Sequence, residues 1–206
     1  MSYAVKEIYY TLQGEGANTG RPAVFLRFAG CNLWSGREQD RSSAICQFCD
    51  TDFIGGTKFT NAEQLAEDVA SQWFGNGTAK RFVVVTGGEP LLQLDRALVE
   101  ALHGEGFRVA IETNGTLAAP SGIDWICVSP KSAAALALRS GDELKLVYPQ
   151  AGARPERFES LAFEHFFLQP MDGPQREAHT REAIAYCLEH PRWRLSLQSH
   201  KIVGIR

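Results

Sequence analysis

Six short apolar runs alternate along the chain with segments of helix-like pattern, and this alternation constrains the fold more than any other feature. The runs are nearly continuous, which is typical of parallel strands covered on both faces. They are residues 23–30, 81–88, 108–113, 124–129, 143–148 and 165–170. Strand–helix alternation predicts an α/β fold with a parallel sheet. A complete eight-fold barrel needs about 250 residues, so these 206 residues predict a single-domain partial (open) parallel β/α barrel spanning 1–206.

Three segments have the periodicity of amphipathic helices: 60–74, 90–103 and 176–190. Thr60 and Glu63 have capping-box spacing at the start of the first. Pro90 is expected in the first turn of the second.

Hydrophobic alternation near the end of the chain predicts that residues 192–198 form a strand and that the chain ends on it. In the preceding helix, Ile184, Cys187 and Leu188 are expected on one buried face.

Charge and hydropathy exclude several classes of protein. The formal net charge is −3, without the basic excess that indicates a nucleic-acid surface. The N-terminal residues lack a basic segment followed by an apolar one, so we expect no signal peptide. No apolar run approaches the roughly 20 residues of a membrane span. We therefore expect a soluble, cytoplasmic protein.

Three of the five cysteines lie in one long polar loop, residues 29–58. Fourteen residues separate Cys31 from Cys46, and two separate Cys46 from Cys49. In a reducing compartment, clustered thiols indicate metal binding or catalysis before disulfides. Structural zinc normally takes four protein ligands, whereas a [4Fe–4S] cluster with three thiolates keeps one iron open for an exogenous ligand. The spacing alone leaves both alternatives open.

Polar residues and glycines end four of the predicted strands. They are GGEP (87–90), ETNGT (112–116), VSPK (128–131) and LQPMDG (168–173). The carboxyl ends of parallel strands meet on one rim, which is where such folds bind ligands. Four such ends on one rim predict a site.

These motifs resemble those of a known family. The cysteine trio, with Phe48 inside the CxxC, Asp50-Thr51 after it and GGEP further on, resembles the radical S-adenosylmethionine superfamily, in which a first gap of three residues is commoner than fourteen. The stretch 11–33, with CDT (49–51), SPK (129–131) and QPMDG (169–173), is similar to the 7-carboxy-7-deazaguanine synthase family. The resemblance runs from about residue 8 onward.

The resemblance implies a lyase that converts 6-carboxy-5,6,7,8-tetrahydropterin to 7-carboxy-7-deazaguanine with loss of ammonia, in queuosine or 7-deazapurine biosynthesis. It implies a [4Fe–4S] cluster on Cys31, Cys46 and Cys49, together with S-adenosylmethionine and Mg²⁺, the last held by Thr51. It also implies an electron donor such as flavodoxin or ferredoxin, and a homodimer. The hard chemistry would belong to the cofactor.

Two sets of residues match the binding positions of that family. The positions expected to contact S-adenosylmethionine are Phe48, Cys49, Asp50, Gly88, Glu89, Ser129, Pro130, Lys131, Gln169, Pro170, Met171 and Asp172. The positions expected to contact the pterin are Leu12, Gln13, Gly14, Glu15, Arg27, Thr86 and Arg206, the last through a terminal carboxylate.

A structural role remains an alternative for several of these residues. Arg27 would meet the substrate carboxylate or form a structural Arg–Glu pair, and Thr51 would bind Mg²⁺ or cap a turn. The insertion 32–45 would be a lid or a solvated loop. Cys127 and Cys187 are expected to be buried, inert thiols, and none of the five histidines is assigned a role.

Two other functions stay open. One is a radical S-adenosylmethionine activase that acts on a partner protein. The other is a zinc-binding structural module.

Overall fold

The computed structural model describes residues 2–76 and 80–206. Its strands form one nine-stranded sheet in the order β3-β1-β2-β4-β5-β6-β7-β8-β9. The strands are β1 Tyr3–Leu12, β2 Pro22–Phe28, β3 Thr57–Phe59, β4 Arg81–Gly87, β5 Phe107–Thr113, β6 Trp125–Val128, β7 Ser140–Tyr148, β8 Ala162–Pro170 and β9 Trp193–Leu195. The α-helices are α1 Ala62–Ser71, α2 Arg96–Gly104, α3 Arg176–Glu189 and α4 Ser199–Val203.

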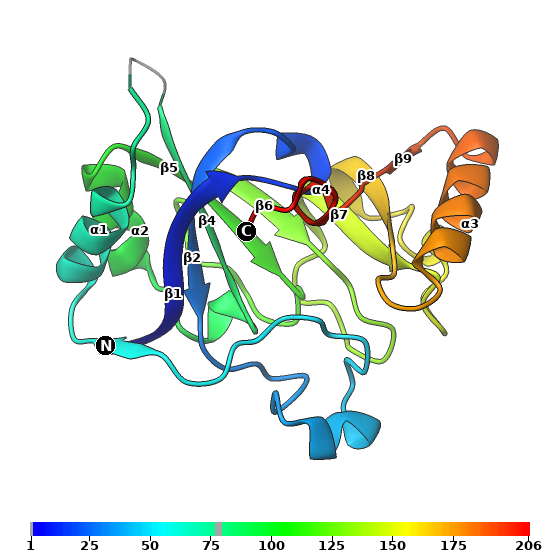
Figure 1. Ribbon diagram of the computed structural model, residues 1–206, viewed down its shortest axis with the longest axis horizontal. Helices are drawn as coiled ribbons and strands as arrows, with labels where there is room; N and C mark the ends of the chain where they lie inside the picture. The colour runs from blue at the N-terminus through cyan, green and yellow to red at the C-terminus, as the bar shows by residue number, and fades with distance from the viewer. Residues whose placement is uncertain (1, 77–79) are drawn as a thin grey trace.

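From β2 to β9 every neighbouring pair of strands is parallel. The sheet ends at β3 on one side and β9 on the other, so it is open, and the predicted partial barrel is confirmed. Helices α1 and α2 cover one end of the sheet and α3 the other (Figure 1). The division into a single domain stays a prediction.

The burial of both faces of the strands explains the nearly continuous apolar runs. In β4, Val83 and Val85 pack outward against α1 and α2, while Phe82 and Val84 face the inside of the barrel. Both faces are therefore buried at the amino-terminal end of the strand. Further along, the inward position is taken by Thr86, next to Arg27 of β2, so the inner face becomes polar toward the carboxyl ends.

Two predicted helix starts are wrong, because α1 and α2 both begin later in the chain than predicted. The side chain of Asn61 accepts a hydrogen bond from the Gln64 amide (2.7 Å), so Asn61 caps α1 and the Thr60/Glu63 capping box does not form. Pro90 begins a short 3₁₀ turn, and α2 starts at Arg96 after the Asp95 cap. In both places a short side chain nearer the helix outcompetes the predicted signal.

The expected buried face of α3 is also wrong. Ala183 is the buried residue of this helix, whereas Ile184 and Leu188 are 41% and 78% exposed. Cys187 was expected to be buried but is only half-buried, and it packs against the core that contains Phe158, Phe166 and Trp193.

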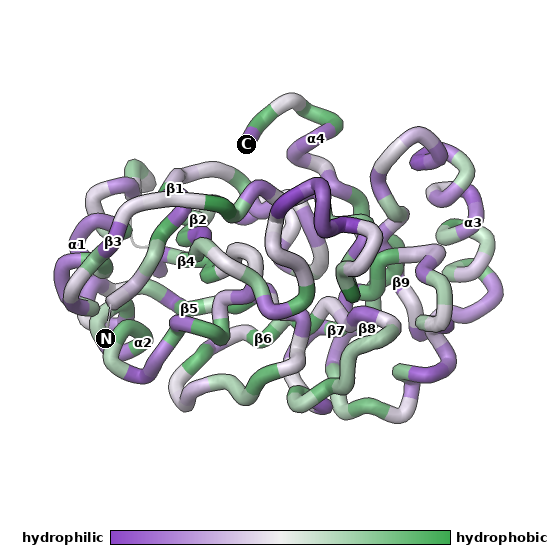
Figure 2. The backbone as a smooth tube through the Cα atoms, turned by 90° about the horizontal axis from the view of Figure 1, so that it is seen from below, coloured by the Kyte–Doolittle hydropathy of each residue, from purple (hydrophilic) through white to green (hydrophobic). Residues whose placement is uncertain are grey.

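The chain end differs from the prediction as well. Strand β9 stops at Leu195, Leu197 is exposed, and the last element is the helix α4. Figure 2 shows α4 and the C-terminus at the edge of the molecule, with apolar residues next to hydrophilic ones. The antiparallel strands β1 and β3 were not predicted. No helix among the described residues is long and apolar enough to cross a membrane.

Candidate active site

A cavity of about 440 Å³ opens at the carboxyl ends of the strands. Its wall combines the cysteine loop, the segment after β1, the inner faces of β2, β4, β5, β6, β7 and β8, and the segment around α4. Segments far apart in the sequence therefore meet at one place, on the rim that the strand ends predicted.

The three clustered cysteines are free thiols at this cavity. Cys46 is buried with Leu33 and Ala134, and Cys31 and Cys49 pack against this apolar group. Contact between the Cys46 and Cys49 thiols lowers the pKa of Cys49 to about 6 and raises the pKa of Cys46. Thiolates are the ligands that iron–sulfur clusters use.

The three thiols lie together on one side of the cavity. Among the residues that the structure describes, no three His, Cys, Asp or Glu groups are placed to hold a single metal ion. Three thiols are one ligand fewer than a structural zinc site normally takes, whereas a [4Fe–4S] cluster held by three thiolates keeps one iron open.

The insertion within the cysteine loop is folded against the CxxC. Trp34 is 8% exposed, packs edge-on against Phe53 at 5.6 Å between ring centroids, and lies under the guanidinium of Arg41. Arg41 also donates to the carbonyl oxygens of Gln47 (2.9 Å) and Cys49 (3.1 Å). The insertion therefore braces the CxxC segment, and Trp34 lines the cavity.

The glycine pair after β4 lets backbone segments approach closely. A Cβ on Gly88 would lie 2.2 Å from the Gly30 carbonyl oxygen and 2.8 Å from the Cys31 Cβ. The Glu89 amide donates to the same Gly30 carbonyl (2.9 Å). The first cysteine is thus held against the end of β4.

Two of the residues expected to contact S-adenosylmethionine do not line the cavity. Glu89 is fully buried and accepts hydrogen bonds from Thr113 Oγ1 (2.6 Å) and the Asn114 amide (2.8 Å). Glu89 therefore fixes the end of β5. Pro130 is also buried, and its carbonyl faces Gln150.

The other ten residues of this set line the cavity. Lys131 Nζ donates to the Ser129 carbonyl (2.6 Å) and hydroxyl (2.8 Å) and lies 6.0 Å from the Phe48 ring centroid. Burial lowers the pKa of Lys131. Asp50 and Asp172 are both bridged by Lys201 of α4, at 2.6 and 2.7 Å, so α4 joins the cysteine loop to the end of β8.

All seven residues of the pterin set also line the cavity. Arg27 donates through Nε to Glu7 (2.8 Å) and through Nη2 to the Tyr9 hydroxyl (3.2 Å). The structural Arg–Glu pair left open by the sequence therefore exists, and the side chain still faces the cavity. Arg206 also pairs with Glu7, and its main-chain oxygen accepts a hydrogen bond from Thr11 (2.8 Å).

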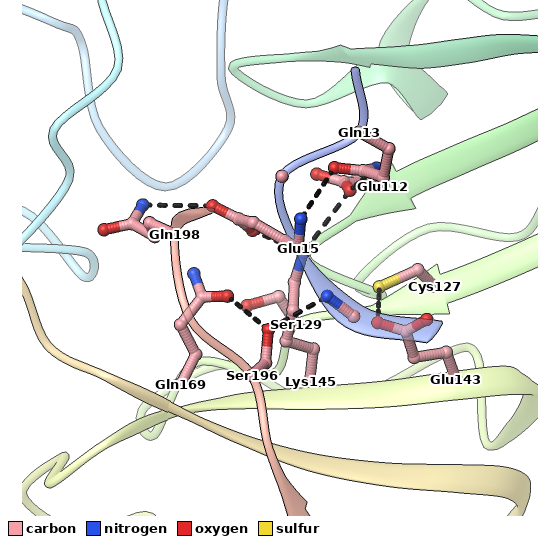
Figure 3. A network of polar contacts seen from close by, with 12 residues as sticks. Gln13, Glu15, Glu112, Cys127, Ser129, Glu143, Lys145, Gln169, Ser196 and Gln198 are labelled. Atoms are coloured by element: carbon pink, nitrogen blue, oxygen red, sulfur yellow. Dashed lines mark hydrogen bonds and ion pairs between the residues drawn. The ribbon is translucent and has the colours of Figure 1, made fainter. Parts of the chain in front are cut away.

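Sequence reasoning missed a buried ionic network beneath this set (Figure 3). Lys145 Nζ lies 2.5 Å from Glu15 and 3.3 Å from Glu112. Although burial raises the pKa of Glu15, the Lys145 ammonium reverses this and lowers it to about 2. The alternation of side chains along a strand could have predicted that Lys145 faces the opposite side from Leu144 and Leu146. In the structure the two leucines pack outward, and Lys145 faces inward.

The segment around α4 supplies three further residues that were not predicted: Gln198, His200 and Lys201. A Cβ on Gly14 would lie 2.2 Å from His200 Nδ1, so this glycine lets α4 approach the segment that follows β1. No local sequence signal places this segment over the site, because its contact between Ser199 and Gly14 joins residues 185 positions apart.

An open parallel barrel with three free cysteines of one loop at the carboxyl ends of its strands is the arrangement of a radical S-adenosylmethionine protein. The model of the Radical SAM superfamily matches residues 40–191. Membership in this superfamily implies a [4Fe–4S] cluster and S-adenosylmethionine.

Full-length relatives narrow the assignment. Proteins described as 7-carboxy-7-deazaguanine synthase from Bordetella pertussis and Burkholderia multivorans are 65% and 60% identical, each over 100% of both chains. The crystal structure of QueE from Escherichia coli matches with a TM-score of 0.69 and 30% identity, covering 97% of this chain and 95% of that one. The chain belongs to the 7-carboxy-7-deazaguanine synthase family.

Proposed function

We propose that this protein converts 6-carboxy-5,6,7,8-tetrahydropterin to 7-carboxy-7-deazaguanine with loss of ammonia. The observation that carries the proposal is that the three thiols, the strand ends and the polar strip after β1 line the same cavity. Close relatives over their full length carry the name of this activity.

In this proposal Cys31, Cys46 and Cys49 hold the [4Fe–4S] cluster. When bound, the cluster and S-adenosylmethionine would supply the radical chemistry of the conversion. The chain's own part is to bind, to orient and to exclude water. Leu33, Phe48 and Ala134 give the thiols an apolar surrounding, and the strand ends after β4, β6 and β8 surround the space beside them.

The substrate residues differ in the group that each can bind. Arg27 is the cation for the pterin carboxylate, because its Nη1 makes none of the hydrogen bonds within the described residues and guanidinium groups bind carboxylates through two donors. Gln13 and Glu15 face the nitrogen-rich edge of the pterin. Gln13 is already oriented by bonds to Glu112 (2.8 Å) and to the Glu15 amide (3.1 Å).

Thr86 and Arg206 complete the pterin set in this proposal. Thr86 lies beside Arg27 in the sheet, and Arg206 is tied to Thr11 and Glu7 of β1. Both therefore lie on the same side of the cavity as the proposed carboxylate site.

We also propose that Mg²⁺ is shared between Thr51 and the substrate carboxylate. Mg²⁺ prefers oxygen ligands and keeps several waters, so one protein hydroxyl is sufficient when a substrate anion contributes another ligand. Thr51 lines the cavity and directly follows the CxxCD segment.

Thr51→Ala is expected to reduce the response of turnover to added Mg²⁺, because the variant loses one oxygen ligand, while the absorbance of the cluster stays unchanged. The measurement is a Mg²⁺ titration of initial rate in both proteins. A matched control is Thr60→Ala, since Thr60 lies outside the cavity. An identical Mg²⁺ response in wild type and Thr51→Ala would assign Thr51 to the turn.

Three wider features are proposed from the family alone. The reductant is a flavodoxin or ferredoxin, the protein is a homodimer, and its product enters queuosine or another 7-deazapurine.

The proposed activity is tested by anaerobic reconstitution followed by incubation with the tetrahydropterin, S-adenosylmethionine, Mg²⁺ and a reductant. We expect 7-carboxy-7-deazaguanine and ammonia in equal amounts, measured by chromatography with mass detection and an ammonia assay. Reductive cleavage of S-adenosylmethionine without any change in the pterin would contradict the proposal and favour an activase.

A further inference from the structure

Lys145 is a buried cation among carboxylates on the inner face of the sheet (Figure 3). Its side chain is 4% exposed. Burial by itself disfavours the ammonium, but Glu112 and Glu15 raise the pKa of Lys145 well above its usual value. The network has one ammonium for two cavity-lining carboxylates, so it is more than a simple neutralised pair.

The hydrogen bonds of this network leave particular oxygen atoms for a ligand. Oε1 of Glu112 accepts from both Lys145 and Gln13, whereas Oε2 of Glu112 accepts no hydrogen bond from any residue in 2–76 or 80–206. Glu15 accepts from Lys145 through Oε2 and from Gln198 through Oε1 (3.0 Å). Both carboxylates also line the cavity.

We propose that Lys145 is a positioning and specificity-determining residue, which orients Glu15 and Glu112 to accept the neighbouring N–H groups of the substrate's 2-amino-4-oxo edge. The inference rests on the proposed function and deepens it. Lys145 holds one oxygen of each carboxylate, so the carboxylates cannot rotate freely. Its positive charge also reduces the repulsion between the carboxylates of Glu15 and Glu112 and the carboxylate of the substrate.

The same geometry predicts how substrate binding depends on pH when Lys145 is replaced. The groups that surround Lys145 are Glu15, Glu112 of β5, Cys127 of β6, Glu143 of β7 and, further away, Lys131. Glu143 is occupied by the Ala17 amide and the Cys127 thiol. With Lys145 present, the pKa of Glu15 is about 2, so Glu15 is ionised at all physiological pH values.

Without Lys145 the pKa of Glu15 rises, because burial is then opposed only by the hydrogen bonds from Gln198 and Gln169. A protonated Glu15 would then present a donor where the substrate needs an acceptor. Substrate binding in such a variant should therefore weaken as the pH falls, while wild-type binding stays flat.

The test measures binding of two probes to the reconstituted holoenzyme, by fluorescence titration. The first is 6-carboxypterin, which has the 2-amino group, and the second is 6-carboxylumazine, which has an oxygen there. We expect wild type to prefer the pterin by at least about a hundredfold, because a site built to donate to or accept from a polar group rejects the analogue that lacks it. In Lys145→Met we expect pterin affinity to fall about tenfold or more and the preference to shrink by a similar factor.

Two further comparisons separate positioning from a general loss of structure. Lys58→Met, at an exposed lysine of β3 outside the cavity, is the matched control and should bind as wild type does. The effects of Glu15→Gln and Lys145→Met should be less than additive in the double variant, because Lys145 acts through Glu15. Between about pH 5.5 and pH 8, pterin affinity should fall with falling pH only in Lys145→Met.

If Lys145→Met does not incorporate the cluster, Lys145→Gln is measured in its place, with the same expected loss of preference. Failure of both variants to fold would assign Lys145 to the stability of the sheet and overturn the proposal. Unchanged affinity, preference and pH profile in a folded variant would overturn it as well. A wild-type holoenzyme that neither binds 6-carboxypterin nor converts the tetrahydropterin would overturn the proposed function too, which distinguishes the two failures.

Discussion

Replacing Cys46 with serine is expected to abolish both the cluster and turnover. Cys46 is 6% exposed and is the most enclosed of the three clustered thiols. A three-thiolate cluster that loses one anchor keeps two points of attachment, and a neutral hydroxyl is a poor replacement for a soft thiolate ligand. We expect wild type to contain about four irons and four sulfides per chain and the variant to contain little of either.

The measurements are iron and sulfide content, visible absorbance and product formation after identical anaerobic reconstitution. Cys187→Ser is the matched control, because Cys187 lies on α3 away from the cavity and should keep the colour and the activity. Stoichiometric zinc without iron uptake in the wild-type protein would contradict the cluster assignment. A Cys46→Ser variant with full iron content would remove Cys46 from the ligand set.

Replacing Gly88 with alanine is expected to reduce activity by about a hundredfold or more, since a shift near 1 Å in a reacting group can have that effect. The new Cβ would lie 2.2 Å from the Gly30 carbonyl and 2.8 Å from the Cys31 Cβ. Neither is the movable end of a side chain, so the backbone that carries Cys31, the first of the proposed cluster ligands, must move. Lower cluster content and a higher KM for S-adenosylmethionine are the expected signs.

Gly104→Ala provides the comparison for this variant. A Cβ on Gly104 meets nothing within 4 Å, and alanine in a helix is favoured over glycine by about 1 kcal/mol or less. We therefore expect unchanged activity and equal or slightly higher thermal stability. Wild-type kinetics in Gly88→Ala would show that the contact between β4 and the cysteine loop does not position the cluster.

The sequence predicted the architecture because the fold depends on local patterns. Nearly continuous apolar runs predicted six parallel strands of an open barrel, and the structure confirms each of the six. In the described residues no α-helix separates β5, β6, β7 and β8, so the strand–helix alternation holds only in part. The site residues that could be predicted are those in contiguous motifs, such as the CxxC and the residues that follow β4. Glu89 shows the limit of this reasoning, because adjacency to Gly88 did not reveal that its carboxylate points into the interior toward Thr113.

Tertiary structure alone decided which distant residues meet at the cavity. Strand alternation could have placed Lys145 on the inner face, but only the tertiary structure shows that it meets Glu15, 130 residues away. Lys201 joins Asp50 to Asp172 across 151 and 29 residues. Local propensities are properties of a few neighbouring residues, whereas such pairs depend on the register of the whole sheet. The chain end makes the same point: alternation predicted a strand, but from Ser199 the chain forms α4, where the Ser199 amide and hydroxyl bond to the Gly14 carbonyl.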